Sequence, residues 1–297
     1  MTQTPREPEL TEVMGERRRL INLAYRLLGS LADAEDVVQE AYARLYALDP
    51  GQRAALREPA AWLTTVATRI CLDQLGSARV RRERYVGEWL PEPIPGTDEG
   101  SGTDPADRIT LDESIDMALL VVLDEMTPAE RVAFLLHDVF GYAFAEIGEI
   151  VGRSPAACRQ LATSARRRVR DARPAQTPPA DDRAVVVRRF RDAWQRGEIR
   201  ELLSVLDADV VMTSDGGGVV PAALAPVRGG TTVADLLAGI IRLADLRLVE
   251  RSVNGQPGLV ATVAGVVDSV LSFEVTDGRV RRIWAVRNPE KLRPWRT

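Results

Sequence analysis

Two helices joined by a tight turn are predicted by residues 143–170, which read A-F-A-E-I-G-E-I-V-G-R-S-P-A-A-C-R-Q-L-A-T-S-A-R-R-R-V-R. Gly152 suits the end of the first helix, because glycine readily adopts the left-handed conformation found there. Ser154 can cap the second helix, and Pro155 suits its first position. The residues that should pack inward recur every four positions: Ala157, Leu161, Ala165 and Val169. The pattern is typical of a helix-turn-helix.

The outward face of the second helix is cationic and would fit a DNA major groove. Between residues 153 and 173 there are seven arginines and one acidic residue. The polar residues of this face are Ser154, Arg159, Gln160, Thr163, Arg166, Arg167, Arg168 and Arg170. A solvated cationic helix in an ordinary bundle is the alternative, but it explains the Gly-x-Ser-Pro turn less well. The face therefore favours DNA binding.

The composition indicates a globular chain of two or three domains, with 297 residues, 45% hydrophobic and 28% charged. The sequence has neither a long apolar run nor an apolar signal core, so we expect a cytoplasmic protein without a membrane segment. Cys71 and Cys158 lack C-x-x-C spacing, which excludes a structural zinc site, and both should stay reduced. Lys291 is the only lysine, so almost every cation of the chain is an arginine. The excess of arginine fits either phosphate binding by guanidinium groups or a genomic GC bias.

Upstream of residue 90 the hydrophobic spacing predicts three amphipathic helices. The first buries Leu20, Leu23, Ala24 and Leu27 and stops at Gly29. The second opens at Asp33, buries Val37, Val38, Ala41 and Leu45, and exposes Glu35, Asp36, Glu40 and Arg44. The third starts at Pro59 and buries Leu63, Val66, Ala67 and Ile70. Its other face carries Trp62, Thr65, Arg69 and Asp73, before Arg79, Arg81, Arg82 and Arg84.

Two stretches rich in proline and glycine, 91–107 and 173–182, read as linkers. The segment after the second linker changes character. A helix is predicted over 183–196 with Val187, Phe190 and Trp194 inward, and strands over 258–267, 270–275 and 280–286. Asn254-Gly255 and Asp277-Gly278 are hairpin turn signals. We expect an α+β unit in which helices and a curved antiparallel sheet enclose a pocket.

The residues resemble the extracytoplasmic-function (ECF) sigma factors of bacteria, in the SigJ-like group with a fused C-terminal SnoaL-like (NTF2-like) domain. Residues 24–45, A-Y-R-L-L-G-S-L-A-D-A-E-D-V-V-Q-E-A-Y-A-R-L, are similar to the sigma region 2 signature. Residues 62–73, W-L-T-T-V-A-T-R-I-C-L-D, are similar to its promoter-melting helix. Three motifs mark the fused group, W-L-P-E-P at 89–93, D-G-G-G at 215–218 and N-P-E-K-L at 288–292.

The resemblance implies a multidomain chain with two all-α sigma domains and a C-terminal α+β cone. Its parts are region 2, a helical bundle, over 9–88, a linker over 89–110, region 4 with the helix-turn-helix over 111–173, and the SnoaL-like domain over 181–297. It also implies an alternative sigma factor that directs promoter-specific initiation and is modulated by its fused domain. We expect a monomer without cofactor or metal, and without a dedicated anti-sigma factor.

The resemblance also assigns partners to particular residues. The β′ clamp helices and the β subunit of core RNA polymerase are the expected protein partners, and the polymerase-binding residues are Asp33, Asp36, Glu40, Tyr42 and Arg44. The minus-10 element would be read by Trp62, Thr65, Arg69, Asp73, Arg79, Arg81 and Arg82, and the minus-35 element by the helix after Ser154. Many relatives have Asn where Arg69 stands and Arg where Gly76 stands, which leaves the captured base open.

The three motifs of the fused group suggest a latch, in which the cone grips the linker. Prolines stiffen W-L-P-E-P, and glycines without a Cβ allow close approach. The residues of the latch would be Trp89, Leu90, Pro91, Glu92, Pro93, Asp215, Gly216, Gly217, Gly218, Asn288, Pro289, Glu290, Lys291 and Leu292. The alternative is that the linker is only spacing, D-G-G-G a hairpin turn and N-P-E-K-L a C-terminal cap.

Enzymatic activity is the competing hypothesis, because SnoaL-like cones include cyclases and isomerases that use Asp and His. The only histidine, His137, lies outside the cone, and Asp209, Asp215 and Asp268 remain as candidate bases. We therefore expect a protein that is not an enzyme. A small-molecule-responsive DNA-binding regulator is one alternative, and a cyclase or isomerase fused to a DNA-binding module is another. A small-molecule or protein effector could act at the cone.

Overall fold

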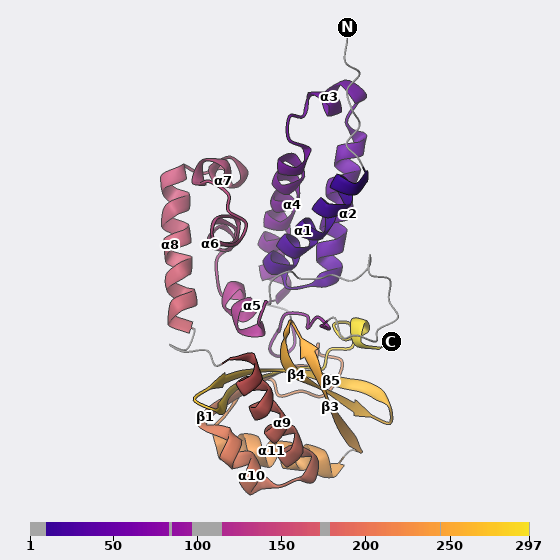
Figure 1. The fold of residues 1–297 in the computed structure, drawn as a ribbon, viewed down its shortest axis with the longest axis vertical. Coiled ribbons are helices and arrows are strands. Elements are labelled where there is room, and N and C mark those ends of the chain that lie inside the picture. The colour runs from indigo at the N-terminus through magenta and orange to yellow at the C-terminus, as the bar shows by residue number, and fades with distance from the viewer. Residues whose placement is uncertain (1–9, 83–84, 97–114, 173–178, 244, 297) are drawn as a thin grey trace. The chain divides into compact units, whose positions relative to one another are not determined.

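The computed structural model describes residues 10–82, 85–96, 115–172, 179–243 and 245–296. The chain forms two compact units (Figure 1). The helical unit consists of Met1–Arg81 and Val122–Asp171, and the α+β unit of Arg82–Val121 and Ala172–Thr297. The segment with W-L-P-E-P therefore belongs to the α+β unit. Within the described residues no helix is long and apolar enough to cross a membrane.

The first part of the helical unit contains α1 (Leu10–Leu28), α2 (Leu31–Ala47), α3 (Pro50–Ala55) and α4 (Pro59–Arg82). Gly29 ends α1 with φ 72°, as predicted. The predicted start of α2 at Asp33 is wrong, because Ser30 is the N-cap and its hydroxyl accepts a hydrogen bond from Asp33 N at 3.2 Å. The inward residues of α2 are confirmed, since Val37, Val38, Ala41 and Leu45 are buried.

The second part contains α6 (Pro128–Phe134), the π-helix η1 (Leu135–Val139), α7 (Phe144–Val151) and α8 (Pro155–Ala172), and α5 (Met117–Asp124) precedes it. The predicted turn is confirmed, because Gly152 has φ 70° and Ser154 Oγ accepts from Ala157 N at 3.2 Å. The inward face of α8 differs from the prediction. Its buried residues are Cys158, Ala162 and Ala165, so the helix is rotated by about one residue from the predicted stripe.

A buried arginine joins the two parts of the helical unit. Arg131 is 3% exposed, and it donates to the carbonyl oxygen of Leu27 at 2.5 Å and to Asp124 at 3.1 Å. Leu27 lies in the last turn of α1, where backbone carbonyls have no partner inside the helix. One guanidinium therefore satisfies the end of α1 and pairs with a carboxylate.

The α+β unit is built from α9 (Ala180–Arg196), α10 (Ile199–Val205), β1 (Leu206–Asp215), β2 (Val227–Arg228), α11 (Gly230–Leu243), β3 (Leu246–Val253), β4 (Gln256–Val263), β5 (Val266–Thr276), β6 (Arg279–Val286) and the short η2 (Arg293–Trp295). The strand order is β2-β1-β6-β5-β4-β3. The sheet is mixed rather than antiparallel, because β1 lies parallel to β6. The predicted architecture of two helical segments and an α+β cone is confirmed.

Two-residue turns connect the last four strands. Asn254-Gly255 and Asp277-Gly278 have positive φ at both residues, which confirms the two predicted hairpins. The predicted single strand over 258–267 is wrong, because Ala264 (φ 50°) and Gly265 (φ 81°) form a third turn between β4 and β5. Alanine seldom adopts a positive φ, so the sequence signal for this turn was weak.

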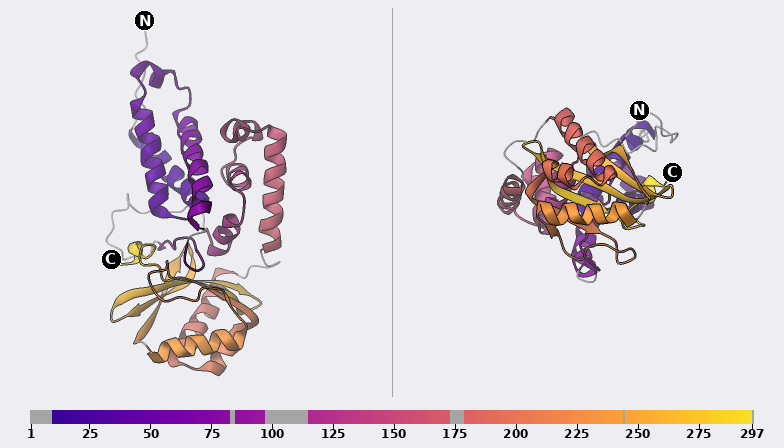
Figure 2. Two further views of the ribbon diagram at one scale, coloured as in Figure 1. Left: turned by 180° about the vertical axis from the view of Figure 1, so that it is seen from behind. Right: turned by 90° about the horizontal axis from the view of Figure 1, so that it is seen from below.

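Helices α9, α10 and α11 cover one face of the sheet (Figures 1 and 2). Aromatic side chains fill the interior between them, with Phe190 5.8 Å from the Trp194 ring and 5.1 Å from the Phe273 ring. Trp194 Nε1 also donates to the carbonyl oxygen of Leu237 at 2.8 Å. We expected the cone to enclose a pocket, but the side chains of Phe190, Trp194 and Phe273 fill the part of its interior where they lie.

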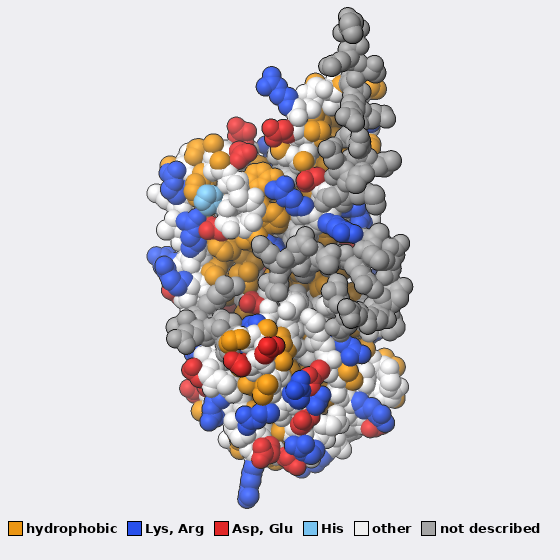
Figure 3. All heavy atoms as spheres, viewed as in Figure 1, with side chains coloured by type: hydrophobic (Ala, Val, Ile, Leu, Met, Phe, Trp, Pro, Cys, Tyr) orange, Lys and Arg blue, Asp and Glu red, His pale blue; other side chains and the backbone are white. Residues whose placement is uncertain are grey.

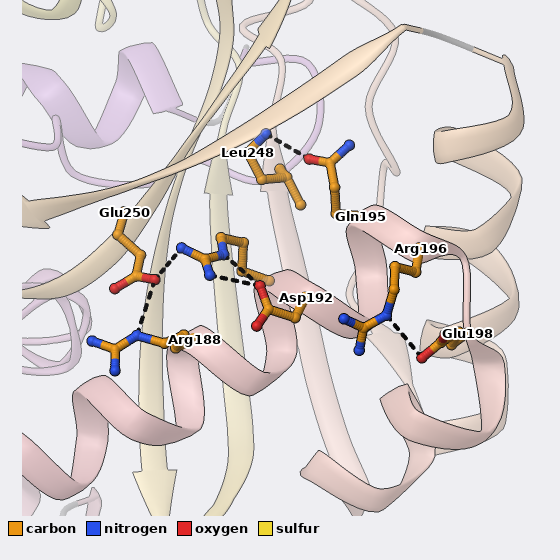
Figure 4. A network of polar contacts seen from close by, with 8 residues as sticks. Arg188, Asp192, Gln195, Arg196, Glu198, Leu248 and Glu250 are labelled. Carbon is orange, nitrogen blue, oxygen red and sulfur yellow. Dashed lines mark hydrogen bonds and ion pairs between the residues drawn. The ribbon is translucent and has the colours of Figure 1, made fainter.

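Polar contacts fix α9 to β3 (Figure 4). Gln195 donates to Leu246 O at 2.7 Å and accepts from Leu248 N at 2.9 Å, while Glu250 pairs with Arg188 and Arg191. On the face shown in Figure 3, cationic and anionic side chains are interspersed over α9 and its neighbours. This part of the surface therefore has mixed charge rather than the single sign that a nucleic-acid surface favours.

The opposite face of the sheet is apolar and is covered by the linker. Its cluster consists of Leu90, Met117, Val253, Val260, Val270, Trp284, Val286 and Leu292. Leu90 comes from W-L-P-E-P, Met117 from the start of α5, and Leu292 from N-P-E-K-L. Burying a leucine side chain contributes roughly 1.5–3 kcal/mol. The linker and the C-terminal segment are thus part of the hydrophobic core of the α+β unit.

Candidate functional site

The exposed row predicted on α2 is present in the helical unit except for Glu35, which is half-buried. Asp36, Glu40 and Arg44 are exposed, and Arg44 pairs with Glu40 at 2.5 Å. Tyr42, an expected polymerase-binding residue, is half-buried, and burial raises its pKa to about 12. Its ring lies 6.4 Å from that of Tyr46, which is 58% exposed. Tyr46 is therefore the more accessible ring, and Asp33 is half-buried in the first turn.

The candidate minus-10 face of α4 is partly engaged inside the helical unit. Arg69 and Asp73 are exposed, while Trp62 and Thr65 are half-buried and Thr65 donates to the carbonyl oxygen of Ala61. Arg69 Nη2 donates to Glu149 O at 3.0 Å, near the end of α7. Arg79, Arg81 and Arg82 continue α4, but their side chains lie outside the described ones.

On α8 the candidate minus-35 residues lie along one polar face. Arg159, Gln160, Thr163, Arg167, Arg168 and Arg170 are exposed, and Ser154 is the N-cap. Arg166 pairs with Asp138 at 2.7 Å, and Arg168 lies 3.8 Å from Glu130. The Arg159 guanidinium lies 5.3 Å from the Phe144 ring, a distance at which the ring can orient it. Arg159, near the N-terminus of α8, is thus oriented by the first residue of α7.

Three motifs that are distant in sequence meet around one buried carboxylate in the α+β unit. Asp215, at the end of β1, is 0% exposed. Its Oδ1 accepts from Tyr85 Oη at 2.5 Å and from Gly217 N at 3.0 Å. Its Oδ2 accepts from Leu90 N at 2.9 Å and from Lys291 Nζ at 2.7 Å. We call the set Tyr85, Trp89, Leu90, Asp215, Gly217, Asn288 and Lys291 the Asp215 junction.

The cation of the Asp215 junction is the only lysine of the chain. Lys291 has a side chain 11% exposed, and Nζ also donates to Leu90 O at 2.5 Å. The ammonium lies 4.1 Å from the centre of the Trp89 ring and 5.4 Å from that of Tyr85. Burial and the hydrogen bond to Asp215 raise the pKa of Tyr85 well above its usual range, so its hydroxyl remains a donor.

N-P-E-K-L closes over the D-G-G-G turn. Asn288 Nδ2 donates to Tyr85 Oη at 2.9 Å, and Asn288 N donates to Asp215 O at 2.9 Å. Gly217 has φ 66°, and a Cβ there would lie 2.5 Å from the Asn288 side chain. A side chain at position 217 is therefore excluded both by backbone conformation and by space. The expected close approach at the glycines is observed.

The linker continues along the edge of the sheet. Asn254 N donates to Ile94 O at 2.8 Å, and Gly96 N donates to Ser252 O at 2.9 Å, so the linker pairs with the end of β3. Trp295 Nε1 donates to Pro93 O at 2.8 Å. Backbone pairing at an edge strand fixes the register of a bound segment as it does in peptide recognition.

The structure brings the predicted latch motifs together but adds residues that the motifs did not contain. Pro91, Glu92, Pro93 and Leu292 are buried, Gly216, Gly218 and Pro289 lie in the same turns, and Glu290 is exposed. Tyr85, Asn254 and Trp295 were missed. The sequence offered only weak signals for them: Tyr85 precedes W-L-P-E-P, Asn254 lies in a hairpin turn, and Trp295 follows N-P-E-K-L.

The candidate carboxylate bases are not gathered at one place. Asp209 is exposed, Asp268 pairs with Arg287 at 2.8 Å, and Asp215 is occupied by four donors. His137 lies in the helical unit, where its ring stacks on that of Phe144 at 3.9 Å. The described residues thus place no imidazole beside these carboxylates.

Comparisons with known proteins cover nearly the whole chain. Sigma-70 region 2 matches residues 13–81, and Sigma-70, region 4 matches residues 116–169. The chain is 39% identical over 298 residues to the ECF RNA polymerase sigma factor SigJ of Mycobacterium tuberculosis, covering 96% of this chain and 93% of that protein. It is 36% identical over 285 residues to the probable ECF RNA polymerase sigma factor SigI of the same species, covering 94% and 93%.

The fold is also similar to a solved structure. The crystal structure of the Mycobacterium tuberculosis extracytoplasmic function sigma factor SigJ has a TM-score of 0.76 and 36% sequence identity. It covers 96% of this chain and 98% of that chain. The likeness therefore includes the C-terminal α+β unit as well as the helices.

The Asp215 junction predicts a large cost for removing its cation. Lys291→Met leaves a buried carboxylate without a cation and should lower the free energy of unfolding by about 3–5 kcal/mol. Asp215→Asn in the same chain should restore a large part of this loss. Urea unfolding followed by circular dichroism measures both effects.

The matched control is Arg196→Met, because Arg196 forms an exposed pair with Glu198. Exposed pairs are worth about 0–1 kcal/mol, so this variant should remain close to the parent. Equal losses for Lys291→Met and Arg196→Met would contradict the assigned importance of the buried pair.

Proposed function

The chain belongs to the ECF RNA polymerase sigma factors, and on that basis we propose which of its residues bind polymerase, read the promoter and regulate both. As an alternative sigma factor it binds core RNA polymerase and promoter DNA and directs transcription initiation. Region 2 is assigned to 9–88, the linker to 89–110, region 4 to 111–173 and the SnoaL-like domain to 181–297.

The exposed row of α2 is the proposed polymerase-binding surface. Asp36 and Glu40 supply negative charge that steers association with a cationic partner, and the partner assigned is the β′ clamp helices. Tyr46 adds an exposed aromatic ring beside Tyr42, and aromatic residues are frequent anchors in protein interfaces. Asp33 and Arg44 lie at the two ends of this row.

Promoter reading is assigned to α4 and α8. Arg159 and Gln160 lie near the N-terminus of α8, where a recognition helix meets base edges, whereas Arg166, Arg167, Arg168 and Arg170 lie further along and suit phosphates. Trp62, Thr65, Arg69 and Asp73 with the arginines that end α4 provide cations and flat or polar groups for the unpaired minus-10 strand.

Arg69 must exchange partners when the promoter is read. In the free chain its guanidinium donates to Glu149 O of α7, and the same group is the proposed minus-10 contact. One hydrogen bond from a charged guanidinium contributes at most about 1.5–3 kcal/mol, and this one is exposed to solvent, so DNA phosphates can replace it. We infer that promoter binding separates Arg69 from α7.

Regulation is assigned to the Asp215 junction, and the observation that carries it is the meeting of three distant motifs around one buried carboxylate. The linker between regions 2 and 4 is held there by hydrogen bonds to Asp215 and Lys291, by the contact of the Lys291 ammonium with the Trp89 ring, and by burial of Leu90. A held linker restricts the positions that the two DNA-reading regions can adopt. An unknown small-molecule or protein effector would act by changing this grip, in place of a dedicated anti-sigma factor.

A catalytic role for the SnoaL-like domain is not favoured. Its three candidate carboxylates are exposed, paired or saturated with donors, and Phe190, Trp194 and Phe273 occupy its interior. General acid-base catalysis needs such groups gathered around a substrate. We assign the domain a regulatory role without a cofactor, and we place the protein in the cytoplasm with its polymerase partner.

The polymerase assignment predicts that charge reversal on α2 weakens core binding. Asp36→Arg with Glu40→Arg should reduce affinity at least tenfold, because close charge pairs at interfaces can be worth about 1.5–7 kcal/mol. Surface plasmon resonance with purified core enzyme measures the affinity. Asp181→Arg with Asp182→Arg, in α9, is the control of equal charge, and unchanged affinity in the α2 variant with retained helix content would refute the assignment.

The promoter assignment predicts two kinds of arginine. Arg159→Ala should lose discrimination at one minus-35 position by roughly 1–3 kcal/mol, whereas Arg167→Ala should weaken all sequences alike and reduce the salt dependence. Binding of holoenzyme to a series of single-base promoter variants measures both effects. If both variants lose affinity by the same pattern across the promoter series, the assignment of Arg159 to bases and of Arg167 to phosphates is wrong.

The regulatory assignment predicts that loosening the junction changes output but not promoter choice. Truncation before Asn288, or Tyr85→Phe, which removes only the hydroxyl between Asp215 and Asn288, should raise run-off transcription several-fold from the same start site. Asp209→Asn, an exposed aspartate of β1, is the control. If folded variants transcribe at the parental level, the junction does not regulate initiation.

A further inference from the structure

A cage for a primary ammonium ion lies inside the Asp215 junction. Two aromatic rings, Tyr85 and Trp89, and two oxygens, Leu90 O and Asp215 Oδ2, surround Lys291 Nζ. Tyr85 directly precedes the linker, Trp89 and Leu90 belong to the linker, and Asp215 ends β1. The ammonium alone is supplied by the segment after the last strand.

The chemistry of the cage selects a primary ammonium. Its two oxygens lie 2.5 and 2.7 Å from Nζ, so the ion must donate at least two hydrogen bonds. A quaternary ammonium has no donor, and a guanidinium is a planar fork rather than a compact point charge. Among 39 lysine and arginine residues, the single lysine occupies this position.

The walls of the cage are held by contacts that do not involve Lys291. Asp215 keeps hydrogen bonds from Tyr85 Oη, Leu90 N and Gly217 N, and the Leu90 side chain is 2% exposed in the apolar cluster. The walls should therefore persist when the lysine side chain is removed. They would then enclose a buried anionic site that lacks its cation.

We propose that this cage is a binding site for a free primary alkylammonium ion, of the class of short aliphatic amines, which enters when Lys291 leaves. The inference rests on the proposed regulatory function, because an amine in the cage would hold the linker without the C-terminal segment. A tethered lysine has an effective concentration of the order of millimolar or more, so a free amine competes poorly in the parent chain. Removing the tethered side chain exposes the site.

Lys291→Ala tests the site with a probe of matched size. Alanine keeps Cβ, so propylammonium supplies the three missing carbons and the nitrogen. Propylammonium chloride should raise the midpoint of thermal unfolding of the full-length variant by several degrees, with saturation in the millimolar range. Trimethylpropylammonium chloride at equal ionic strength should not, because it cannot donate hydrogen bonds. Asp215→Asn in the Lys291→Ala chain should abolish the response.

Two outcomes overturn the proposal. One is an equal effect of propylammonium and trimethylpropylammonium on Lys291→Ala, and the other is an undiminished effect after Asp215→Asn. Should Lys291→Ala not fold alone, the yield of refolding is measured instead, and equal yields with the two salts overturn the proposal. This experiment measures stability, whereas the regulatory proposal is tested by transcription from the truncated chain. A negative result in one experiment therefore does not imply a negative result in the other.

Discussion

The buried ion pair between Asp215 and Lys291 is the interaction on which the arrangement of the α+β unit depends. A carboxylate in a low-dielectric interior is costly unless donors and a cation surround it. Here the donors come from Tyr85 and the linker that follows it, from the D-G-G-G turn and from the C-terminal segment. If one of these segments leaves, the buried carboxylate loses part of its compensation. The pair therefore makes the attachment of three distant segments cooperative.

The proposed regulatory role of the fused domain depends on this constraint. The linker that joins the two promoter-reading regions also completes the apolar face of the sheet through Leu90 and pairs with the end of β3. Such a linker behaves as a folded element of the domain rather than as a flexible spacer. A change at the Asp215 junction would pass to both DNA-reading regions through the segment that they share.

Local signals predicted much of the fold, and long-range contacts account for the rest. Gly29, Gly152 and the Ser154-Pro155 start of α8 followed from helix-end chemistry, whereas Ser30 was missed because Asp33 is an equally good cap by type. The turn at Ala264-Gly265 was missed because alanine rarely adopts positive φ. The three latch motifs were predicted by resemblance, but Tyr85 and Asn254 bond residues more than a hundred positions away, which no local pattern encodes.

Hydrogen-deuterium exchange of residues 85–96 in the full-length protein tests the central claim most directly. The amides of Leu90, Ile94 and Gly96 donate to Asp215, Asn254 and Ser252. We expect protection of these amides close to that of β3, and faster exchange without full loss of protection in Lys291→Met, because opening then costs less. Exchange at the rate of an unfolded chain in the parent protein, with β3 still protected, would contradict it.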